Sequence, residues 1–253
     1  MIIANLATYP PRRENLLPVV QAIAPQVDQL NVVLNQYDAE LPELVDIPNV
    51  KQIIPHEDTK DVGKFYPNVS DADFVFMIDD DLIYPADFVE RSVASLTALG
   101  PSGFMGGHHA SLYMKPSFSL SPKKLIAWVR YADVKIADYR APFRFYETLE
   151  QPTVVDQIAT NAAIMRGADF PPYEFMAGSQ KFVDVRLARW CFEHDIRPVA
   201  LPKVEGWLGE VRFEETIFNG FTRNNHPHVS EEIWTYAFKV PGRGAPVTPD
   251  AER

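Results

Sequence analysis

Three consecutive carboxylates, Asp79, Asp80 and Asp81, directly follow the apolar run "FVFMI" at 74–78. Adjacent like charges repel, and neighbouring side chains on a strand cannot share a face. The acids must therefore be solvated, cap the following helix or be neutralised by a cation. Carboxylates separated by one residue, at a point where the backbone turns, can converge on a hard divalent cation such as Mg²⁺ or Mn²⁺. Such a cation bridges substrate phosphates, and it would stabilise a departing nucleoside diphosphate.

A strand and a helix position this cluster. The run at 74–78 lacks polar alternation, which is typical of a strand that is buried on both faces of a parallel sheet. Beyond the acids, Pro85 suits the first helical position, and an apolar stripe continues to a stop at Gly100. The acids therefore lie at the carboxyl end of a strand, where open α/β sheets bind their ligands.

The same alternation of strand and helix recurs along the chain. Further apolar runs predict strands at 2–7, 30–35 and 50–54 and a strand-like stretch at 152–166, and amphipathic stretches predict helices from about residue 13 and over 182–192. This alternation predicts an α/β fold with a mostly parallel, Rossmann-like sheet flanked by helices. Residues 101–150 are rich in aromatic and turn residues, and their periodicity predicts no clear element.

The composition predicts one folded domain. The 253 residues are 46% hydrophobic and contain no linker or repeat, so we expect a single domain over residues 1–240. Its nucleotide-binding half would extend over about 1–100 and its acceptor-binding half over about 101–240. The last residues, 241–253, have the composition of a disordered tail.

Charge and cysteine content argue against several classes of protein. The formal net charge of -10 argues against a nucleic-acid partner, because phosphate backbones bind to basic surfaces. Cys191 is the only cysteine, so no internal disulfide forms. No apolar stretch approaches the ~20 residues of a membrane-spanning helix. We expect a cytoplasmic protein; peripheral membrane association through a partner stays open, and the sequence predicts no oligomeric state.

The segment "FVFMIDDDLIYPADFVE" resembles the DxD segment of GT-A glycosyltransferases. Three more segments, "LNVVLNQYDAELPEL", "DVGKFYP" and "FVDVRLARWCFEHDIRPVALPKVEGWL", occur in the same order as in bacterial family 2-like glycosyltransferases of the capsular and surface polysaccharide type. The resemblance extends over roughly residues 2–209. It implies a GT-A fold and Mn²⁺- or Mg²⁺-dependent transfer of a sugar from a nucleotide-sugar donor, most simply a UDP-sugar, to a saccharide hydroxyl. The setting would be surface polysaccharide or glycoconjugate synthesis.

The resemblance assigns roles on the donor side. Asp79 and Asp81 match the DxD carboxylates: Asp81 would bind the metal directly, and Asp79 would reach the metal or the donor's ribose. Asp80 is grouped with the donor-binding residues, with simple solvation as the alternative. A histidine from the C-terminal region, His226 or His228, would complete the metal site. The remaining residues expected near the nucleotide are Thr8, Tyr9, Arg12, Asn35, Asp38, Asp61 and Lys64. For Thr8, Tyr9 and Arg12 the alternative is an ordinary turn, and for Lys64 it is a surface lysine. Gly63 would let the backbone approach the ligand.

On the acceptor side, the resemblance points to Asp184 as the general base that removes the proton from the acceptor hydroxyl, with inversion at the anomeric carbon. An aspartate that stabilises its own helix start is the alternative, and a retaining outcome stays open. Asn161, Trp207 and His108 are the expected acceptor-binding residues. Trp207 could stack on a sugar ring, although core packing explains a tryptophan equally well.

Two rival functions follow from the same features. A sugar-phosphate nucleotidyltransferase shares the sheet, the metal and the nucleotide, but it should carry a glycine-rich basic loop after the first strand, and "TYPPRREN" has no glycine. A non-catalytic carbohydrate-binding relative would keep the fold and lose the chemistry. The acids at Asp79, Asp81 and Asp184 argue against that loss.

Overall fold

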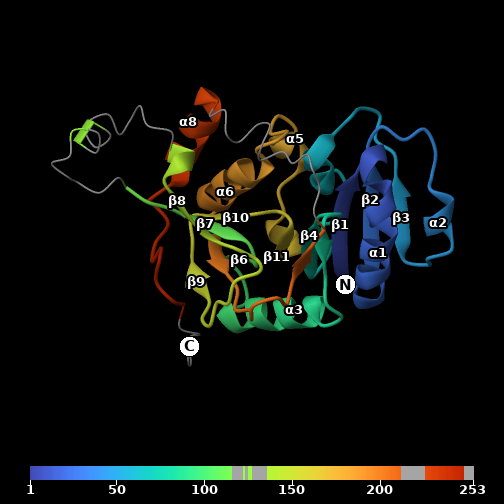
Figure 1. Cartoon of the computed structure of the whole chain (residues 1–253), viewed down its shortest axis with the longest axis horizontal. Coiled ribbons are helices and arrows are strands. Elements are labelled where there is room, and N and C mark those ends of the chain that lie inside the picture. Colours follow the sequence, from blue (N-terminus) through green and yellow to red (C-terminus); the bar gives the residue numbers. More distant parts are fainter. Residues whose placement is uncertain (116–121, 123–124, 127–135, 212–225, 248–253) are drawn as a thin grey trace.

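A computed structural model describes residues 1–115, 122, 125–126, 136–211 and 226–247 (Figure 1). Its centre is an eight-stranded sheet with the order β3-β2-β1-β4-β11-β6-β12-β9. The strands are β1 (Ile2–Thr8), β2 (Gln29–Leu34), β3 (Val50–Ile53), β4 (Phe74–Ile78), β6 (Phe104–Gly107), β9 (Thr153–Val154), β11 (Ala162–Met165) and β12 (Arg197–Ala200). The strands predicted at 2–7, 30–35, 50–54 and 74–78 are confirmed.

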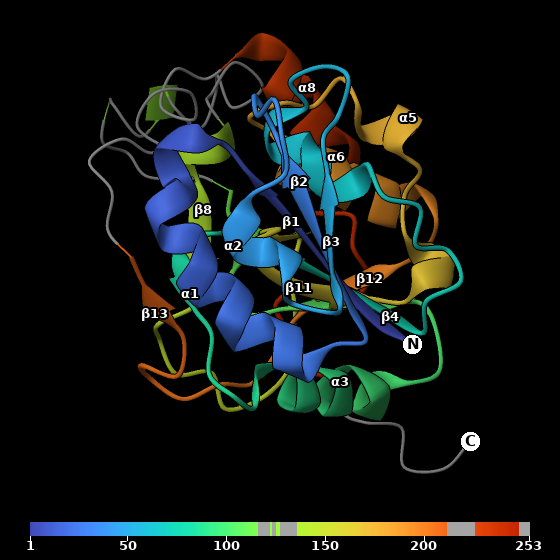
Figure 2. The ribbon, with the colours of Figure 1, turned by 90° about the vertical axis from the view of Figure 1, so that its right-hand side faces the viewer.

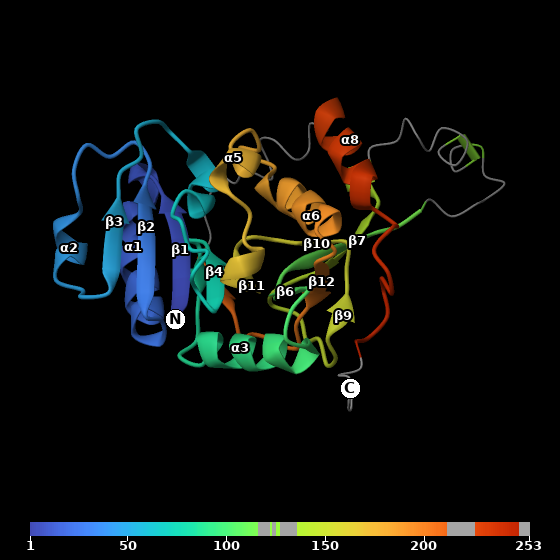
Figure 3. The ribbon, with the colours of Figure 1, turned by 180° about the vertical axis from the view of Figure 1, so that it is seen from behind.

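Helices cover both faces of this sheet, as expected for an α/β fold. They are α1 (Arg13–Ile23), α2 (Pro42–Val45), α3 (Phe88–Leu99), α5 (Tyr173–Met176), α6 (Val183–Glu193) and α8 (Pro227–Tyr236). In Figure 1, and from behind in Figure 3, α3 lies below the sheet and α6 above it, with α8 beside α6. Figure 2 shows α1 running across the strands at the amino-terminal end of the chain.

Alternation along β4 explains why this strand is apolar throughout. Phe76 and Ile78 join the core formed with α1 and α3, whereas Met77 joins the core formed with α6. Successive side chains of a strand point to opposite faces, so a strand covered on both sides needs an apolar residue at every position. All three side chains are fully buried.

The direction of β11 matters for function. Strands β3, β2, β1 and β4 are parallel, whereas β11 is antiparallel to β4, with Ala162 opposite Ile78. The start of β11 therefore lies beside the end of β4. The stretch 152–166, predicted as strand-like, is divided into β9, β10 (Gln157–Ile158) and β11 by intervening turns.

Two smaller sheets complete the fold, and two of their strands, β7 (Ala110–Tyr113) and β8 (Arg140–Phe143), come from the region 101–150, whose periodicity predicted no element. Strand β7 pairs with β10 on one side and with β8 on the other. Strand β5 (Leu82–Ile83) pairs with β13 (Gly209–Glu210). Antiparallel pairs as short as these leave no recognisable period in the sequence.

The prediction of a disordered tail from residue 241 is wrong for residues 241–247. Gly244 N–H donates to the Val154 carbonyl at 2.8 Å, and Val247 N–H donates to the Pro152 carbonyl at 2.7 Å. Arg243 donates to both carboxylate oxygens of the fully buried Asp156, at 2.9 and 2.7 Å. This ion pair anchors the segment, and its partner is 87 positions away in the sequence. Residues 248–253 lie outside the described residues.

Within the described residues, no helix combines the length and the apolar character needed to cross a bilayer.

Candidate active site

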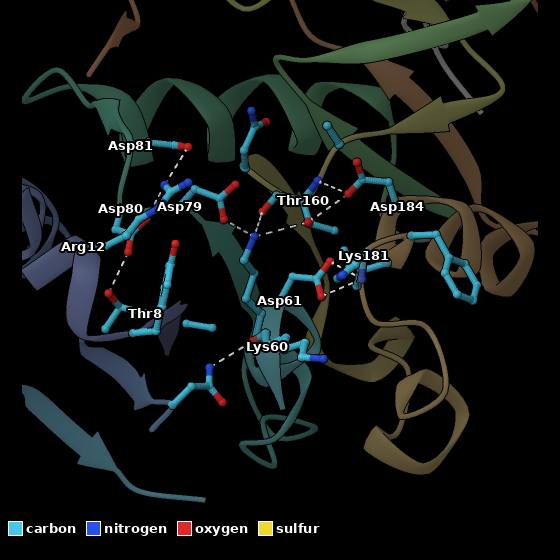
Figure 4. Close-up of a pocket in the computed structure, with 18 of the residues that line it drawn as sticks. Thr8, Arg12, Lys60, Asp61, Asp79, Asp80, Asp81, Thr160, Lys181 and Asp184 are labelled. Carbon is cyan, nitrogen blue, oxygen red and sulfur yellow. Dashed lines mark hydrogen bonds and ion pairs between the residues drawn. The ribbon is translucent and has the colours of Figure 1, made fainter. Parts of the chain in front are cut away.

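A cavity of about 730 Å³ opens where β1, β2 and β4 end and where β11 and α6 begin (Figure 4). Each element contributes polar side chains: Thr8 ends β1, Asn35 follows β2, and Asp79 follows β4. Asn161 precedes β11, and Asp184 lies in the first turn of α6. The carboxyl ends of parallel strands share one edge of a sheet, and the antiparallel β11 begins at that edge, so these side chains converge.

Most of the predicted site residues line this cavity. They are Thr8, Tyr9, Arg12, Asn35, Asp61, Lys64, Asp79, Asp80, Asp81, Asn161 and Asp184. The structure does not bring Asp38, His108, Trp207, His226 or His228 to its wall. Asp38 is an exposed residue of the loop after β2.

The environment of Asp80 differs most from what the sequence predicted for the three acids. It is 4% exposed, so it is not simply solvated. Its Oδ2 accepts a hydrogen bond from Thr8 Oγ1 at 2.6 Å, and its Oδ1 accepts one from Arg12 Nη1 at 2.9 Å. The same Nη1 donates to Asp81 Oδ2 at 2.8 Å. Burial raises the pKa of Asp80 to about 6, although Arg12 and Thr8 favour the charged form. Asp80 therefore ties the loop after β1 to the loop after β4.

Lys64 lies under the acids and is not a surface lysine. It is 2% exposed, forms an ion pair with Asp79, and donates to the Thr160 carbonyl at 3.1 Å and to Thr160 Oγ1 at 3.3 Å. Burial alone would lower its pKa, but the charges of Asp79, Asp184 and Asp61 outweigh burial and raise it. Lys64 is therefore a permanent cation at the floor of the cavity.

Thr160 connects Lys64 to Asp184, and Figure 4 shows Thr160 beside Asp184. Its backbone N–H and its hydroxyl both donate to Asp184 Oδ1, at 2.8 and 2.9 Å. These two bonds fix the orientation of the carboxylate. Asp184 Oδ2 accepts no hydrogen bond from the residues that the structure describes, and the residue lines the cavity. One oxygen of Asp184 is thus held, and the other remains available to a substrate hydroxyl.

Asp61 and Lys181 form the wall between the 3-10 helix at Lys60–Phe65 and α6. Both carboxylate oxygens of Asp61 accept the Lys181 N–H, at 2.9 and 3.0 Å. Burial raises the pKa of Asp61 to about 6, opposed by this hydrogen bond and by Lys64. Lys181 has a φ of 73°, a left-handed conformation that a lysine seldom adopts. The hydrogen bonds to Asp61 hold the backbone in that conformation.

Asn35 and Gly63 position the loop that carries Lys64. Asn35 Oδ1 accepts hydrogen bonds from the backbone and hydroxyl of Thr59, and its Nδ2 donates to the Lys60 carbonyl at 3.0 Å. A Cβ on Gly63 would lie 2.7 Å from Thr59 Oγ1 and 3.1 Å from the Cβ of Ala7. Gly63 does not line the cavity. Its small size serves tight packing against β1 rather than the approach of a ligand.

The two remaining acceptor-side candidates lie on the other side of the sheet, against α3. Trp207 Nε1 donates to Asp87 at 2.9 Å, and its ring packs against Phe88 and His108. His108 is 1% exposed, and burial lowers its pKa to about 3. Its neighbour His109, at the bend between β6 and β7, lines the cavity instead. His108 is therefore buried, and the half-buried Trp207 packs against the core.

The C-terminal histidines lie beyond Asp184. His226 precedes α8 and lines a second, smaller cavity, and the ring of His228 packs against Phe182 at 5.4 Å. Across the described residues, no three side chains among His, Cys, Asp and Glu are grouped to hold a metal ion. The structure therefore does not join His226 or His228 to Asp79 and Asp81.

Several residues of the site carried no signal in the sequence. Tyr84 is buried, donates from its hydroxyl to the Asn161 carbonyl at 2.6 Å, and accepts the Asp79 N–H at 2.9 Å. It therefore locks the end of β4 to the start of β11. Thr160, His109, Arg140 and Lys181 also line the cavity. The antiparallel course of β11 brings in Thr160 and the placement of β8 brings in Arg140, whereas His109 and Lys181 lie in the connections before β7 and α6.

The net charge around the three acids is suited to a divalent cation, because part of their negative charge is not offset. Arg12 and Lys64 offset two of the three negative charges of the trio. The side chains of Asp79 and Asp81 are 31% and 29% exposed, and within the described residues Asp79 Oδ2 and Asp81 Oδ1 accept no hydrogen bond. Burial and the charge of Asp79 raise the pKa of Asp81. Two such carboxylates suit a cation that takes its remaining ligands from phosphate and water.

Solved structures with this architecture are known. The crystal structure of a mycobacterial protein matches with 16% identity and a TM-score of 0.50 over 88% of this chain and 70% of that chain. Glucosyl-3-phosphoglycerate synthase from Mycobacterium tuberculosis, in complex with Mn²⁺, UDP-glucose and phosphoglyceric acid, matches with 15% identity and a TM-score of 0.53 over 92% and 80%. Another structure of that enzyme matches with 14% identity and a TM-score of 0.51 over 94% and 82%.

No protein-family model matches the sequence, and no curated protein matches it. At these identities the structural matches show the fold. The predicted GT-A fold, with a large, mostly parallel central sheet between helices, is confirmed.

Proposed function

We propose that this chain is a metal-dependent glycosyltransferase that transfers a sugar from a UDP-sugar to an acceptor hydroxyl. The observation that carries the proposal is the arrangement of two acidic groups in one cavity. Asp79 and Asp81 present open carboxylate oxygens at the end of β4, and Asp184 presents one at the start of α6. Lys64 and Thr160 connect them. Solved enzymes that share the fold bind Mn²⁺ and UDP-glucose, which supports the choice of donor.

Asp79 and Asp81 would hold Mn²⁺ or Mg²⁺ against the donor diphosphate. The bound cation supplies charge neutralisation for the departing UDP. Arg12 and Lys64 hold these acids in place through ion pairs with Asp81 and Asp79. The lysine also contributes a positive charge to the floor on which the diphosphate would lie, so that its effect adds to that of the cation.

Asp184 would act as the general base. Its Oδ2 would take the proton of the acceptor hydroxyl while that oxygen forms a bond to the anomeric carbon and the bond to UDP breaks. With Asp184 as the base, we expect the transfer to invert the anomeric carbon. The hydroxyl becomes more acidic as the new bond forms, so a carboxylate that Thr160 holds in a fixed orientation suffices. Surface polysaccharide or glycoconjugate synthesis remains the setting that the sequence resemblance predicts.

The loop after β1 disfavours the nucleotidyltransferase alternative. Such an enzyme needs free basic groups there for a triphosphate. Here Arg12 donates to Asp80 and Asp81, and Arg13 donates to Glu43 at 2.7 Å. Both basic residues of the loop therefore have carboxylate partners.

The proposal is tested by following UDP release from a panel of UDP-sugars with Mn²⁺, by ³¹P NMR, alongside incubation with a sugar phosphate and a nucleoside triphosphate. We expect UDP to form from at least one donor, and the rate to fall at least 100-fold on chelation or in Asp81→Asn. Pyrophosphate formation would instead identify a nucleotidyltransferase. No turnover with any donor would favour a binding protein.

A further inference from the structure

Asn161 lies between the proposed metal site and the proposed base. Its backbone carbonyl accepts a hydrogen bond from the Tyr84 hydroxyl at 2.6 Å, and the same hydroxyl accepts the Asp79 N–H at 2.9 Å. On the other side, the preceding residue Thr160 holds Asp184 through two hydrogen bonds. Asn161 lines the large cavity in this interval. The transferred sugar would occupy the same interval, because its anomeric carbon lies between the departing diphosphate and the acceptor oxygen.

His109 is held against this segment by its backbone and by its ring. Its carbonyl accepts the Ala159 N–H at 2.8 Å, and its ring nitrogen Nδ1 lies 3.3 Å from Asn161 Nδ2. The ring also packs against Phe145 in a T-shaped arrangement, with the ring centroids 5.7 Å apart. His109 lines the large cavity and is partly exposed there. The imidazole is therefore fixed in orientation at the cavity wall, beside Asn161.

The contact with Asn161 determines which ring nitrogen of His109 carries the proton. An amide N–H₂ group only donates, so Nδ1 accepts, and the proton of the neutral imidazole is on Nε2. Burial and the positive charges of Arg140 and Lys203 lower the pKa of His109 to about 4, so the ring is neutral at pH 7. Within the described residues, Nε2 has no hydrogen-bond partner. His109 therefore offers one neutral N–H group to a ligand.

The side chain of Asn161 holds this arrangement at a cost in stability. Its Oδ1 is buried and accepts no hydrogen bond from the residues that the structure describes. A buried polar atom without a partner is unfavourable and uncommon in folded proteins, and its presence calls for a functional reason. The orientation of His109 supplies that reason, because the amide nitrogen of Asn161 is the atom that lies against the imidazole.

Ser111 adds a second neutral group to the same wall. It lies in β7, two residues after His109, and it also lines the large cavity. Its side chain belongs to a residue that is 6% exposed, and its hydroxyl has no hydrogen-bond partner within the described residues. An uncharged N–H group and an uncharged hydroxyl match the hydroxyls of a sugar ring, whereas phosphate oxygens favour cationic donors.

We propose that His109 Nε2–H donates a hydrogen bond to a hydroxyl of the transferred sugar, that Asn161 positions the imidazole for this contact, and that Ser111 binds a neighbouring hydroxyl. The inference rests on the proposed function, because the metal site and Asp184 locate the sugar between them. A site that binds a particular hydroxyl strongly rejects a sugar that lacks it or directs it elsewhere, since the donor in the protein is then left without a partner. His109 is therefore the residue that selects among UDP-sugars.

The test is a calorimetric titration of UDP, UDP-glucose, UDP-galactose and UDP-N-acetylglucosamine into the protein with Mn²⁺. In His109→Phe, which keeps a ring and removes the N–H group, we expect the tightest-binding UDP-sugar to lose at least tenfold in affinity, while UDP changes less than threefold. His109→Gln again offers an N–H group and should lose less. Asn161→Ala keeps the carbonyl that Tyr84 uses and should weaken the same UDP-sugar without weakening UDP. His56→Gln, at an exposed histidine outside both cavities, should change neither affinity.

The binding results and the transfer assay separate the two proposals. Equal losses for UDP and the UDP-sugar in His109→Phe, or no loss for any UDP-sugar, would overturn the sugar contact, and UDP release by the wild type would leave the transferase intact. A loss confined to the UDP-sugar, together with no transfer from any donor, would keep the contact and remove the proposed function. A wild-type protein that binds no UDP-sugar would overturn both.

Discussion

Thr160 donates both its backbone N–H and its hydroxyl to a single carboxylate oxygen of Asp184. Its hydroxyl and carbonyl also accept from Lys64, which pairs with Asp79. One threonine therefore links the proposed base to the proposed metal site. Because a base must be held within hydrogen-bonding reach of the proton it removes, this contact should matter for turnover more than for donor binding.

Replacing Thr160 with valine tests this contact. The variant keeps the backbone N–H and loses the hydroxyl, so Asp184 loses one of its two hydrogen bonds. We expect kcat to fall about 10- to 100-fold while the Kd for UDP changes less than threefold. Thr160→Ser keeps the hydroxyl and should retain most of the activity. Equal losses in both variants would show that Thr160 serves packing only.

Removal of the base should have a larger effect. Asp184→Asn keeps the shape and the acceptor oxygen for Thr160 but cannot take up a proton. We expect kcat to fall about 10²- to 10⁴-fold with UDP affinity retained. Glu193→Gln, an exposed acid at the other end of α6, is the matched control. Activity near the wild-type level in Asp184→Asn would remove this residue from the chemistry.

Asp61 should make stability depend on pH. Its pKa is about 6 in the folded protein, raised from 3.8 by burial. The folded state therefore binds the proton more tightly than the unfolded state, so stability is lost as the pH rises from about 4 to about 6, and the loss is complete above that window. Asp61→Asn avoids this loss. We expect the variant to gain about 1–2 kcal/mol relative to wild type between pH 4.5 and pH 7.5, measured by urea unfolding.

The same urea unfolding experiment can also contradict the raised pKa of Asp61. A stability difference between Asp61→Asn and wild type that stays constant across this pH range would mean that Asp61 titrates at its ordinary value. Asp58→Asn serves as the comparison, because Asp58 is an acid on the same cavity wall that accepts hydrogen bonds from the Gln36 side chain and the Lys60 N–H.

Arg243 should hold the C-terminal segment. Arg243→Met leaves the fully buried Asp156 without its charged partner, and breaking such a pair typically costs about 3–5 kcal/mol. Arg189→Met breaks an exposed pair with Glu193 and should cost less than about 1 kcal/mol. Adding Asp156→Asn to Arg243→Met should recover part of the loss, as chemical denaturation would show. Equal effects of the two arginine variants would contradict a structural role for the buried pair.

The sequence predicted those parts of the fold that depend on local pattern. A strand buried on both faces must be apolar throughout, so "FVFMI" and the runs at 2–7, 30–35 and 50–54 identified half of the central sheet. The acids at the end of β4 followed from the same pattern. The amphipathic face of α6 placed Asp184 in a first helical turn.

Contacts between residues that lie far apart in the sequence could not be predicted. Thr160 enters the site only because β11 is antiparallel to β4. A difference of one residue decides that His109 faces the cavity and His108 faces the core. Arg243 lies in a stretch whose composition resembles a flexible tail, and its partner Asp156 gives no local sign of the pairing. The spacing of residues along the chain predicts none of these contacts.

The central claim is that Asp79 and Asp81 hold a divalent cation against a nucleoside diphosphate, and a calorimetric titration of UDP tests it most directly. We expect Mn²⁺ to strengthen UDP binding at least tenfold in the wild-type protein and in Asp38→Asn, whose site is exposed and outside the cavity. In Asp81→Asn that enhancement should disappear. Equal UDP affinity with and without Mn²⁺, or an undiminished enhancement in Asp81→Asn, would contradict the account.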